Sequence, residues 1–369
     1  MFTLQSTNKL ALEKYHQCAA ELRRLAFERA IAVPDTVEVE TVNLDNVAVP
    51  ADYDGPHLTL PITVEQVESV CEAFSRQKLI HRKYVYLILQ QCYRYFQKQK
   101  SLIRVPVAAQ GTIKVFGDVH GQYYDVLNIF KVAGKPSAEN PMLFNGDFVD
   151  RGAFSCEIIL VFLAYKLALP EAFFLNRGNH EALSMNRMYG FEREVKHKYG
   201  ERAFEMFLEV FRMLPLGHVL NDRVLVVHGG LFAQDGVTLK DIENIDRNRE
   251  PPDSGIMCDL LWSDPMDENG RQPSKRGVGV QFGPDVTKRF LDENKLDILV
   301  RSHEVRESGY TVEHDGRCIT IFSAPNYCDN VGNLGAFITF TGETMTPVFT
   351  HFTAVPHPKV SSFAGPLFG

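Results

Sequence analysis

The sequence has few of the features that hold small or secreted folds together. Its seven cysteines are scattered over 369 residues, and no two of them form a C-x-x-C pair. This pattern argues against a disulfide framework and suits free thiols in a reducing compartment. A chain of this length can bury a large core without metals or disulfides. Any metal ligands in it are therefore expected to be functional rather than structural.

Long apolar runs and blocks of basic residues are also missing. There is no stretch of about eighteen apolar residues, and Met1–Leu10 lacks the apolar core of a secretory signal. We therefore expect a soluble protein with no membrane partner, located in the cytoplasm, the nucleus or both. The formal net charge is −7. Without a basic tail or patch, this charge argues against a nucleic-acid partner.

The chain divides into four predicted segments. Residues 1–32 form an amphipathic helix, with its apolar stripe between Asn8 and Ile31. Residues 33–62 are acidic and contain prolines, and no Lys or Arg occurs from Ala30 to Ser75. Such a composition indicates a solvated tether. Residues 63–358 form a catalytic domain, and 359–369 form a C-terminal tail.

The catalytic segment alternates between helical and strand patterns. Thr63 and Gln66 have the spacing of a capping box, and a second helix is predicted from His81 to Lys98. Short apolar runs then predict strands at 112–116, 142–144, 173–175, 224–227, 298–300, 319–322, 336–340 and 345–349. This alternation favours a layered α/β architecture.

Polar side chains follow five of these strands at the points where they end. They occur in Gly117-Asp118-Val119-His120-Gly121, Gly146-Asp147-Phe148-Val149-Asp150-Arg151-Gly152, Gly178-Asn179-His180-Glu181, His228-Gly229-Gly230 and Arg301-Ser302-His303. The carboxyl ends of strands are where α/β sheets place their sites. A lone Asp-x-His is more often a turn with a surface histidine. Five polar segments, each placed directly after a strand, together predict one site.

The donors in this set are carboxylates, imidazoles and an amide oxygen, without thiolates. Such N/O ligation suits Mn²⁺, Fe, Zn²⁺ or Mg²⁺. Six candidate ligands exceed the needs of one catalytic metal and suit two metals about 3.5–4 Å apart. Hydrolysis of a phosphate ester further needs a general acid and guanidinium groups. His180, Asp150 and Arg151 are available for these tasks.

The motifs GDVHG, GDFVDRG, GNHE and HGG together resemble the signature of the phosphoprotein phosphatase family of metallophosphoesterases. The resemblance continues through 260–265, 275–278 and 323–328, and it covers roughly residues 56–358. It implies a calcineurin-like β-sandwich flanked by helices in four layers, α/β/β/α. It also implies a protein serine/threonine phosphatase that hydrolyses phosphoserine and phosphothreonine monoesters with a metal-bridging hydroxide.

The resemblance also implies a role for each site residue. The first metal would be held by Asp118, His120 and Asp147, and the second by Asp147, Asn179, His228 and His303. His180 would be the general acid, oriented by Asp150. The phosphate would be bound by Arg151, Arg276, Tyr327 and Asn179. The cofactors would be two divalent ions, with Mn²⁺ the first expectation and Fe/Zn or Mg²⁺ the alternatives.

Two departures affect what the resemblance implies. Segments 247–255, 302–306 and 352–358 point to a subfamily that has an asparagine where this chain has Ser184. That subfamily begins with tetratricopeptide repeats, and here only 14–32 resembles the end of them. We therefore expect the repeats, and with them chaperone binding and repeat-mediated autoinhibition, to be absent. The expected partners are phosphoprotein substrates and regulatory proteins.

Three alternative functions can be weighed against the sequence. Cys18 and Arg24 have the spacing of a cysteine-dependent phosphatase, but the intervening sequence is helical and lacks the glycines of a phosphate loop. Another metallophosphoesterase, such as a phosphodiesterase, nucleotidase or nuclease, would share the metal ligands. A non-catalytic interaction protein would predict the loss of a ligand or of the acid, and none is missing.

Overall fold

The computed structural model describes Lys14, residues 39–361 and Phe363. Contacts divide the chain into one unit of residues 1–36 and a second of residues 37–369. The fold described below is that of the second unit. The predicted helix at 8–31 lies outside the described residues except for Lys14.

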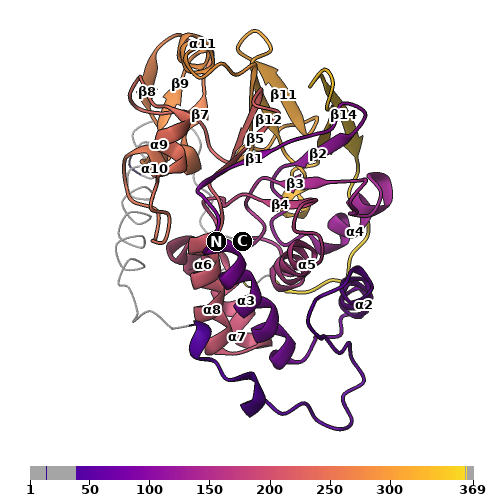
Figure 1. Cartoon of the computed structure of the whole chain (residues 1–369). Coiled ribbons are helices and arrows are strands. Elements are labelled where there is room, and N and C mark those ends of the chain that lie inside the picture. The colour runs from indigo at the N-terminus through magenta and orange to yellow at the C-terminus, as the bar shows by residue number, and fades with distance from the viewer. Residues whose placement is uncertain (1–13, 15–38, 362, 364–369) are drawn as a thin grey trace. The chain divides into compact units, whose positions relative to one another are not determined.

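Two mixed sheets form the centre of this unit (Figure 1). The six-stranded sheet has the order β1-β5-β6-β10-β12-β11, and the five-stranded sheet has the order β14-β13-β2-β3-β4. The strands of the first sheet are β1 Leu102–Val105, β5 Gly217–Leu220, β6 Val224–Val227, β10 Ile298–Arg301, β12 Cys318–Ile321 and β11 Tyr310–Glu313. Those of the second are β14 Pro347–Phe352, β13 Gly335–Thr341, β2 Thr112–Phe116, β3 Met142–Phe144 and β4 Phe173–Leu175. A small third sheet contains β7 Asp264–Pro265, β9 Val280–Phe282 and β8 Arg271–Pro273.

The two large sheets pack face to face through a shared apolar layer. Val224 and Val226 of β6 contact this layer, which also contains Ile113 and Val115 of β2. The alternate residues of β6, Leu225 and Val227, belong to a different core on the outer face. Side chains of a strand point alternately to its two faces, so β6 is covered on both sides. This explains why it appears in the sequence as a continuous apolar run.

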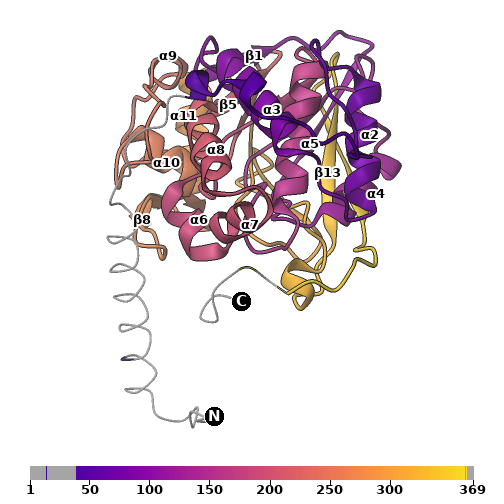
Figure 2. The same cartoon turned by 90° about the horizontal axis from the view of Figure 1, so that it is seen from below.

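Helices cover both outer faces, which completes the four layers α/β/β/α. The five-stranded sheet is covered by the helices α2 Val64–Ser75, α3 Arg82–Phe96, α4 Tyr123–Val132, α5 Ser155–Ala168, α6 Leu183–Tyr189, α7 Phe191–Lys198 and α8 Glu201–Met213. The six-stranded sheet is covered by α9 Leu239–Glu243, α10 Ile256–Trp262 and α11 Pro284–Glu293. Figure 2 shows α5 surrounded by other elements, and its residues from Ser155 to Lys166 are all buried.

The interpretation of residues 33–62 as a solvated tether is wrong for the part that the structure describes. Val39, Leu58 and Ile62 are buried in the core beneath α2 and α3. The side-chain amide of Gln90 donates to the carbonyls of Val39 and Val42, at 3.0 and 2.7 Å. Buried backbone carbonyls need such partners. The acidic side chains face outward, and the apolar residues between them anchor the segment to the body.

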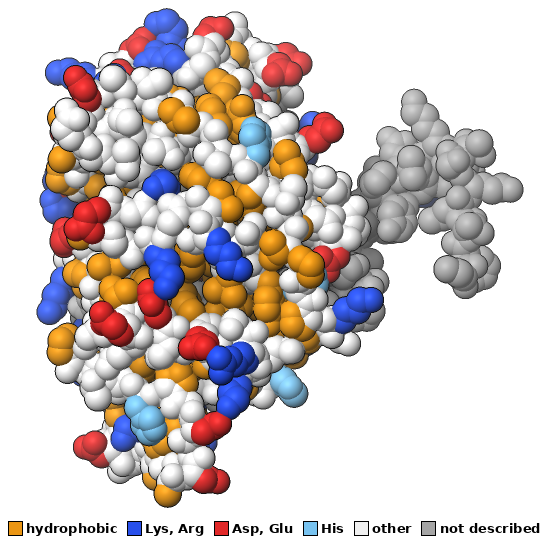
Figure 3. All heavy atoms as spheres, turned by 90° about the vertical axis from the view of Figure 1, so that its right-hand side faces the viewer, with side chains coloured by type: hydrophobic (Ala, Val, Ile, Leu, Met, Phe, Trp, Pro, Cys, Tyr) orange, Lys and Arg blue, Asp and Glu red, His pale blue; other side chains and the backbone are white. Residues whose placement is uncertain are grey.

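Most predicted elements agree with the observed ones. The capping box of Thr63 and Gln66 is present, and α3 begins one residue after its N-cap, His81. The strands β1, β5, β11 and the small third sheet were not predicted. Among the helices that the structure describes, none is long and apolar enough to cross a membrane. On the face drawn in Figure 3, acidic and basic side chains are interspersed with apolar ones.

Candidate metal centre and active site

The polar residues predicted from the strand ends come together where the two sheets meet. β2, β3 and β4 of one sheet precede Asp118, Asp147 and Asn179, while β6 and β10 of the other precede His228 and His303. A bridge between Asp118 and Phe322 joins the two sheets at this point. All six predicted ligands, including His120, are buried. Burial of so many acidic and imidazole groups is costly unless they are paired or bind a cation.

Asp147 belongs to two groups of potential metal ligands, one with His120 and His180 and one with His228 and His303. One carboxylate oxygen lies 3.4 Å from Nε2 of His120, and the other lies 3.3 Å from Nε2 of His228. Asp118 is close to the first group, with Oδ2 3.7 Å from Nε2 of His120. A carboxylate shared by two ligand groups is the arrangement of a two-metal site.

The tautomers of two histidines follow from their backbone contacts. Nδ1 of His120 lies 3.0 Å from the carbonyl oxygen of Val149, and Nδ1 of His228 lies 2.8 Å from that of Asn145. A carbonyl only accepts, so in both rings Nδ1 carries the hydrogen. When the ring is neutral, the lone pair is then on Nε2, which faces Asp147. Metal-binding histidines are commonly oriented by such contacts.

The environment of the Asn179 amide fits a cation. Its Oδ1 lies 2.9 Å from Nε2 of His228, and the same end of the amide is 3.0 Å from Nδ1 of His303 and 3.1–3.2 Å from both carboxylate oxygens of Asp147. These atoms are all acceptors when the histidines are neutral. With its nitrogen turned to this position, the amide would donate to these atoms instead. With its oxygen there, the amide completes the N/O donor set that a divalent ion requires.

The ionisation of the carboxylates gives a second indication. Burial, followed by the negative charge of Asp147, raises the pKa of Asp118 above its ordinary value. Two carboxylates that are buried so close together repel each other when both are ionised. A bound cation would remove this repulsion and keep both in the form that binds metal. The residues present therefore fit divalent metal ions.

His180 and Asp150 form a buried pair beside this cluster. Nδ1 of His180 lies 2.8 Å from Oδ2 of Asp150, and the His180 ring stands edge-on to that of His120, with centroids 4.7 Å apart. Asp150 also accepts from the side chain of Asn186 and from the backbone N–H of Phe191. These contacts fix the carboxylate, which in turn orients the imidazole. A ring nitrogen of His180 lies within 4.8 Å of potential ligand atoms of His120 and Asp147.

Glu181 was not predicted as a site residue, yet it holds two of the predicted loops together. Its carboxylate accepts from the backbone N–H groups of Asp147, Phe148 and Gly178, at 2.8–2.9 Å. A Cβ at Gly178 would lie 2.3 Å from the Asp147 backbone nitrogen and from its Oδ1. Only glycine permits this approach. The position of Glu181 within the GNHE motif was the available signal, but the sequence does not show which backbone groups its carboxylate binds.

Besides Asn179, the residues predicted to bind phosphate come from three separate segments of the chain. The Arg151 guanidinium packs over the ring of Tyr189, 3.8 Å from its centroid. Arg276 donates to Asp264 from Nε at 2.6 Å, and its Nη2 lies 3.2 Å from the His303 carbonyl oxygen. The Tyr327 ring lies 5.3 Å from that of His120, centroid to centroid. Ser184, the departure noted above, is in the first turn of α6.

Asp264 is a second residue that sequence reasoning missed. One of its oxygens also accepts from Nη2 of Arg301 at 2.7 Å, and Arg301 is fully buried. Arg301 directly precedes Ser302 and His303 in the chain. Asp264 therefore connects the predicted phosphate-binding Arg276 to the strand end that supplies His303.

Comparisons with known proteins agree with the fold and the site. Residues 111–307 match the family of calcineurin-like phosphoesterases. The chain is 50% identical to serine/threonine-protein phosphatase 5 of *Homo sapiens*, covering 97% of this chain and 72% of that protein. It is 52% identical to serine/threonine-protein phosphatase T of *Trypanosoma brucei brucei*, covering 96% and 75%. A solved serine/threonine phosphatase of *Saccharomyces cerevisiae*, described as similar to human PP5, aligns with a TM-score of 0.77 and 44% identity, covering 79% of this chain and 96% of that one.

The chain therefore belongs to the calcineurin-like phosphoesterases and, among them, to the family of serine/threonine-protein phosphatases 5 and T. The predicted subfamily, phosphatase 5, is confirmed. Residues 15–104 also match a family described as the PPP5 TPR repeat region. This match runs against the expectation that the repeat region is absent. The part of this match that the structure describes begins at residue 39. It contains α2, α3 and β1, which pack within the unit of residues 37–369.

Proposed function

We propose that this protein removes phosphate from phosphoserine and phosphothreonine side chains of proteins, using two divalent metal ions. The observation that carries the proposal is the position of Asp147 between two buried ligand groups, next to the His180–Asp150 pair. Membership of the family supports a phosphatase, and the donor set supports divalent ions. Mn²⁺ is our first choice for the activating ion, with Fe/Zn or Mg²⁺ as alternatives.

The proposed ligands are the two groups around Asp147 without His180, together with Asp118 and Asn179, which lie beside them. Asp118, His120 and Asp147 would hold one ion, and Asp147, Asn179, His228 and His303 would hold the other. When bound, two such ions activate a water molecule, bind phosphate oxygens and offset the charge that develops during in-line displacement. The contacts of His120 and His228 to backbone carbonyls place the hydrogen of each neutral ring on Nδ1, which leaves Nε2 as the atom that would bind an ion.

The remaining steps are assigned to side chains of the protein. Arg151, Arg276, Tyr327 and Asn179 would bind and orient the phosphate, since guanidinium groups match phosphate oxygens in geometry and charge. A serine alkoxide is a poor leaving group, so it must be protonated as it departs. We assign this step to Nε2 of His180. Asp150, on the opposite nitrogen, would keep the ring oriented and stabilise its protonated form.

The test is a comparison of two substrate classes with the purified chain. It should hydrolyse a phosphoserine peptide in the presence of Mn²⁺ and lose this activity after treatment with a chelator. Hydrolysis of bis(p-nitrophenyl) phosphate, a diester, should be slower. Faster cleavage of the diester would instead assign the chain to the phosphodiesterases. Metal analysis of the same preparation should give two ions per chain.

A further inference from the structure

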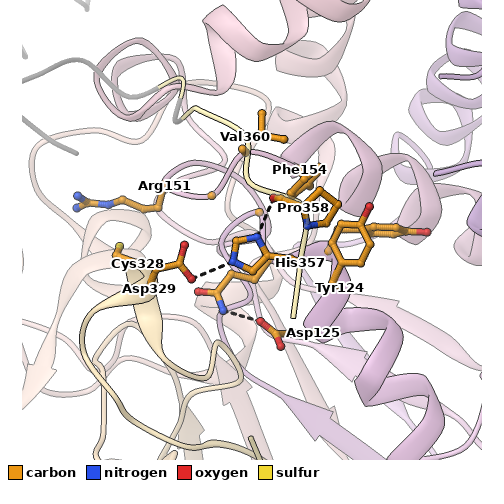
Figure 4. Close-up of a pocket in the computed structure, with 14 residues that line it drawn as sticks. Tyr124, Asp125, Arg151, Phe154, Cys328, Asp329, His357, Pro358 and Val360 are labelled. Carbon is orange, nitrogen blue, oxygen red and sulfur yellow. Dashed lines mark hydrogen bonds and ion pairs between the residues drawn. The ribbon is translucent and has the colours of Figure 1, made fainter. Parts of the chain in front are cut away.

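Beside Arg151 lies a cavity of about 160 Å³ that the proposed chemistry does not use. Figure 4 shows its walls, which come from four segments. These are the start of α4 with Tyr124 and Asp125, the loop before α5 with Arg151 and Phe154, the turn after Tyr327, and the C-terminal segment 357–360. The cavity therefore adjoins the candidate active site, with which it shares Arg151.

The acidic and imidazole groups in the walls already have hydrogen-bond partners. Asp125 accepts from the Gln122 side chain and from the backbone N–H of Val355, both at 2.8 Å. Nε2 of His357 lies 3.0 Å from a carboxylate oxygen of Asp329, and its Nδ1 lies 3.0 Å from the Pro358 carbonyl oxygen. A ligand that brought hydrogen-bonding groups of its own would have to displace these contacts.

Apart from Arg151, the rest of the side-chain lining is mainly apolar and aromatic. The rings of Tyr124 and Phe154 meet edge to face, with centroids 5.2 Å apart, and Pro358 lies beside them in Figure 4. Val360 lines the rim, and 43% of it remains exposed. An apolar cavity of about 150 Å³ is large enough to bind benzene. The cavity beside Arg151 thus has room for one aliphatic side chain or one aromatic ring.

We propose that this cavity is a specificity subsite for an apolar side chain, of the size of Leu or Phe, within two positions of the phosphorylated residue of the substrate. The proposal rests on the proposed function, because Arg151 is assigned there to the phosphate. A phosphoresidue bound at Arg151 brings its sequence neighbours to the mouth of the cavity, since adjacent Cα atoms are about 3.8 Å apart. The segment 357–360 forms one wall, so the C-terminal part of the chain takes part in substrate selection.

The experiment measures kcat/KM for a panel of phosphoserine peptides with Mn²⁺. Each of the two positions on either side of the phosphoserine is varied among Ala, Asp, Leu and Phe. At one position, Leu and Phe should exceed Ala by about tenfold, and Asp should be the poorest. p-Nitrophenyl phosphate, which has no flanking residues, is measured alongside as the reference for the chemical step.

Two variants test the location of the subsite. Val360→Asp places a charge at the rim, and Ala153→Phe fills the cavity from the loop before α5. In both, the ratio of kcat/KM for the Phe peptide to that for the Ala peptide should fall toward one. The matched control is Val348→Asp on β14, which is also exposed and does not line the cavity, and it should keep the parental ratio.

The outcomes separate the two proposals. A flat peptide panel with normal turnover, or a preference that both variants retain, would overturn the subsite and leave the phosphatase assignment intact. Turnover of p-nitrophenyl phosphate without turnover of any phosphoserine peptide would overturn the proposed function itself. A preference lost in both variants and kept in the control supports the subsite.

Discussion

Nδ1 of His180 lies 2.8 Å from a carboxylate oxygen of Asp150, and both side chains are buried. Because this contact occupies one ring nitrogen, only Nε2 can exchange a proton with a substrate. The same Asp150 oxygen lies 3.2 Å from the side-chain amide nitrogen of Asn186. The pair is therefore held in one geometry, as required of a general acid.

Replacing His180 with Asn should reduce kcat for a phosphoserine peptide by about 10²–10⁴-fold, the usual contribution of a general acid. The metal content should stay at the parental value. The loss should be smaller for p-nitrophenyl phosphate, because its leaving group needs less protonation. Steady-state kinetics on both substrates measure this difference. Equal losses on the two substrates would show that His180 acts in some other way, and full activity would refute the mechanism.

Glu181→Gln should weaken metal binding. Its carboxylate accepts three backbone N–H groups that fix the Asp147 and Asn179 loops, whereas an amide has only one acceptor oxygen. Loss of such a supporting contact typically costs about 10–100-fold in metal affinity. Calorimetric titration of the metal-free protein with Mn²⁺ measures this directly.

The control for this variant is Glu68→Gln. Glu68 lies on α2, far from the site in sequence, and its partly exposed side chain forms an ion pair with Lys135. It should bind Mn²⁺ with the parental affinity. If Glu181→Gln also bound Mn²⁺ with the parental affinity and differed only in thermal stability, the residue would be structural and not a positioning residue of the metal centre.

The sequence predicted the strands that are buried on both faces and the residues at their ends. β2, β3, β4 and β6 have the predicted bounds, because their apolar runs are short and end abruptly at glycine, asparagine or histidine. β1 contains Arg104 and β5 contains Gly217 and His218, so neither has a continuous apolar pattern. Their pairing across more than a hundred residues is a tertiary property that no local pattern encodes.

The supporting residues of the site were harder to predict than its ligands. Metal ligands are recognisable by donor type and by their place after a strand, whereas Glu181 binds backbone N–H groups and Asp264 binds two arginines. Which groups they reach depends on how the loops fold. For a similar reason the sequence around Val39 and Leu58 predicts a tether, although the segment is anchored to the body. Its few apolar residues are separated by acidic ones, and only the packed structure shows that they are buried.

Arg276→Lys should weaken phosphate binding without a comparable change in the chemical step. Two nitrogens of the Arg276 guanidinium contact Asp264, and a lysine cannot reproduce that fork. We expect the inhibition constant of inorganic phosphate to rise by roughly tenfold, since the remaining charge is poorly positioned. Product-inhibition kinetics measure it. Arg223→Lys, at an exposed ion pair with Asp297, is the matched control and should leave the constant unchanged.

His218 makes the stability of the fold depend on pH. Burial, with a further contribution from the charge of Lys166, lowers its pKa to about 3. Its Nδ1 lies 2.7 Å from Oδ1 of Asn176, so the folded protein keeps this ring neutral. Between the ordinary value of 6.5 and about 3, the unfolded chain binds a proton that the folded protein does not. Stability therefore falls as the pH is lowered through this range, by about 1.4 kcal/mol per pH unit.

The His218→Gln variant cannot bind a proton at this position in either the folded or the unfolded state. Its side-chain amide can still donate a hydrogen bond to Asn176. The difference in unfolding free energy between pH 7 and pH 5 should therefore be smaller than in the parent by about 2 kcal/mol. Urea unfolding at both pH values, in the same metal-saturated buffer, measures it. His218→Asn, with a shorter side chain, should be less stable at both pH values and show the same reduction. Parallel pH dependence in the parent and both variants would mean that His218 is protonated in the folded state.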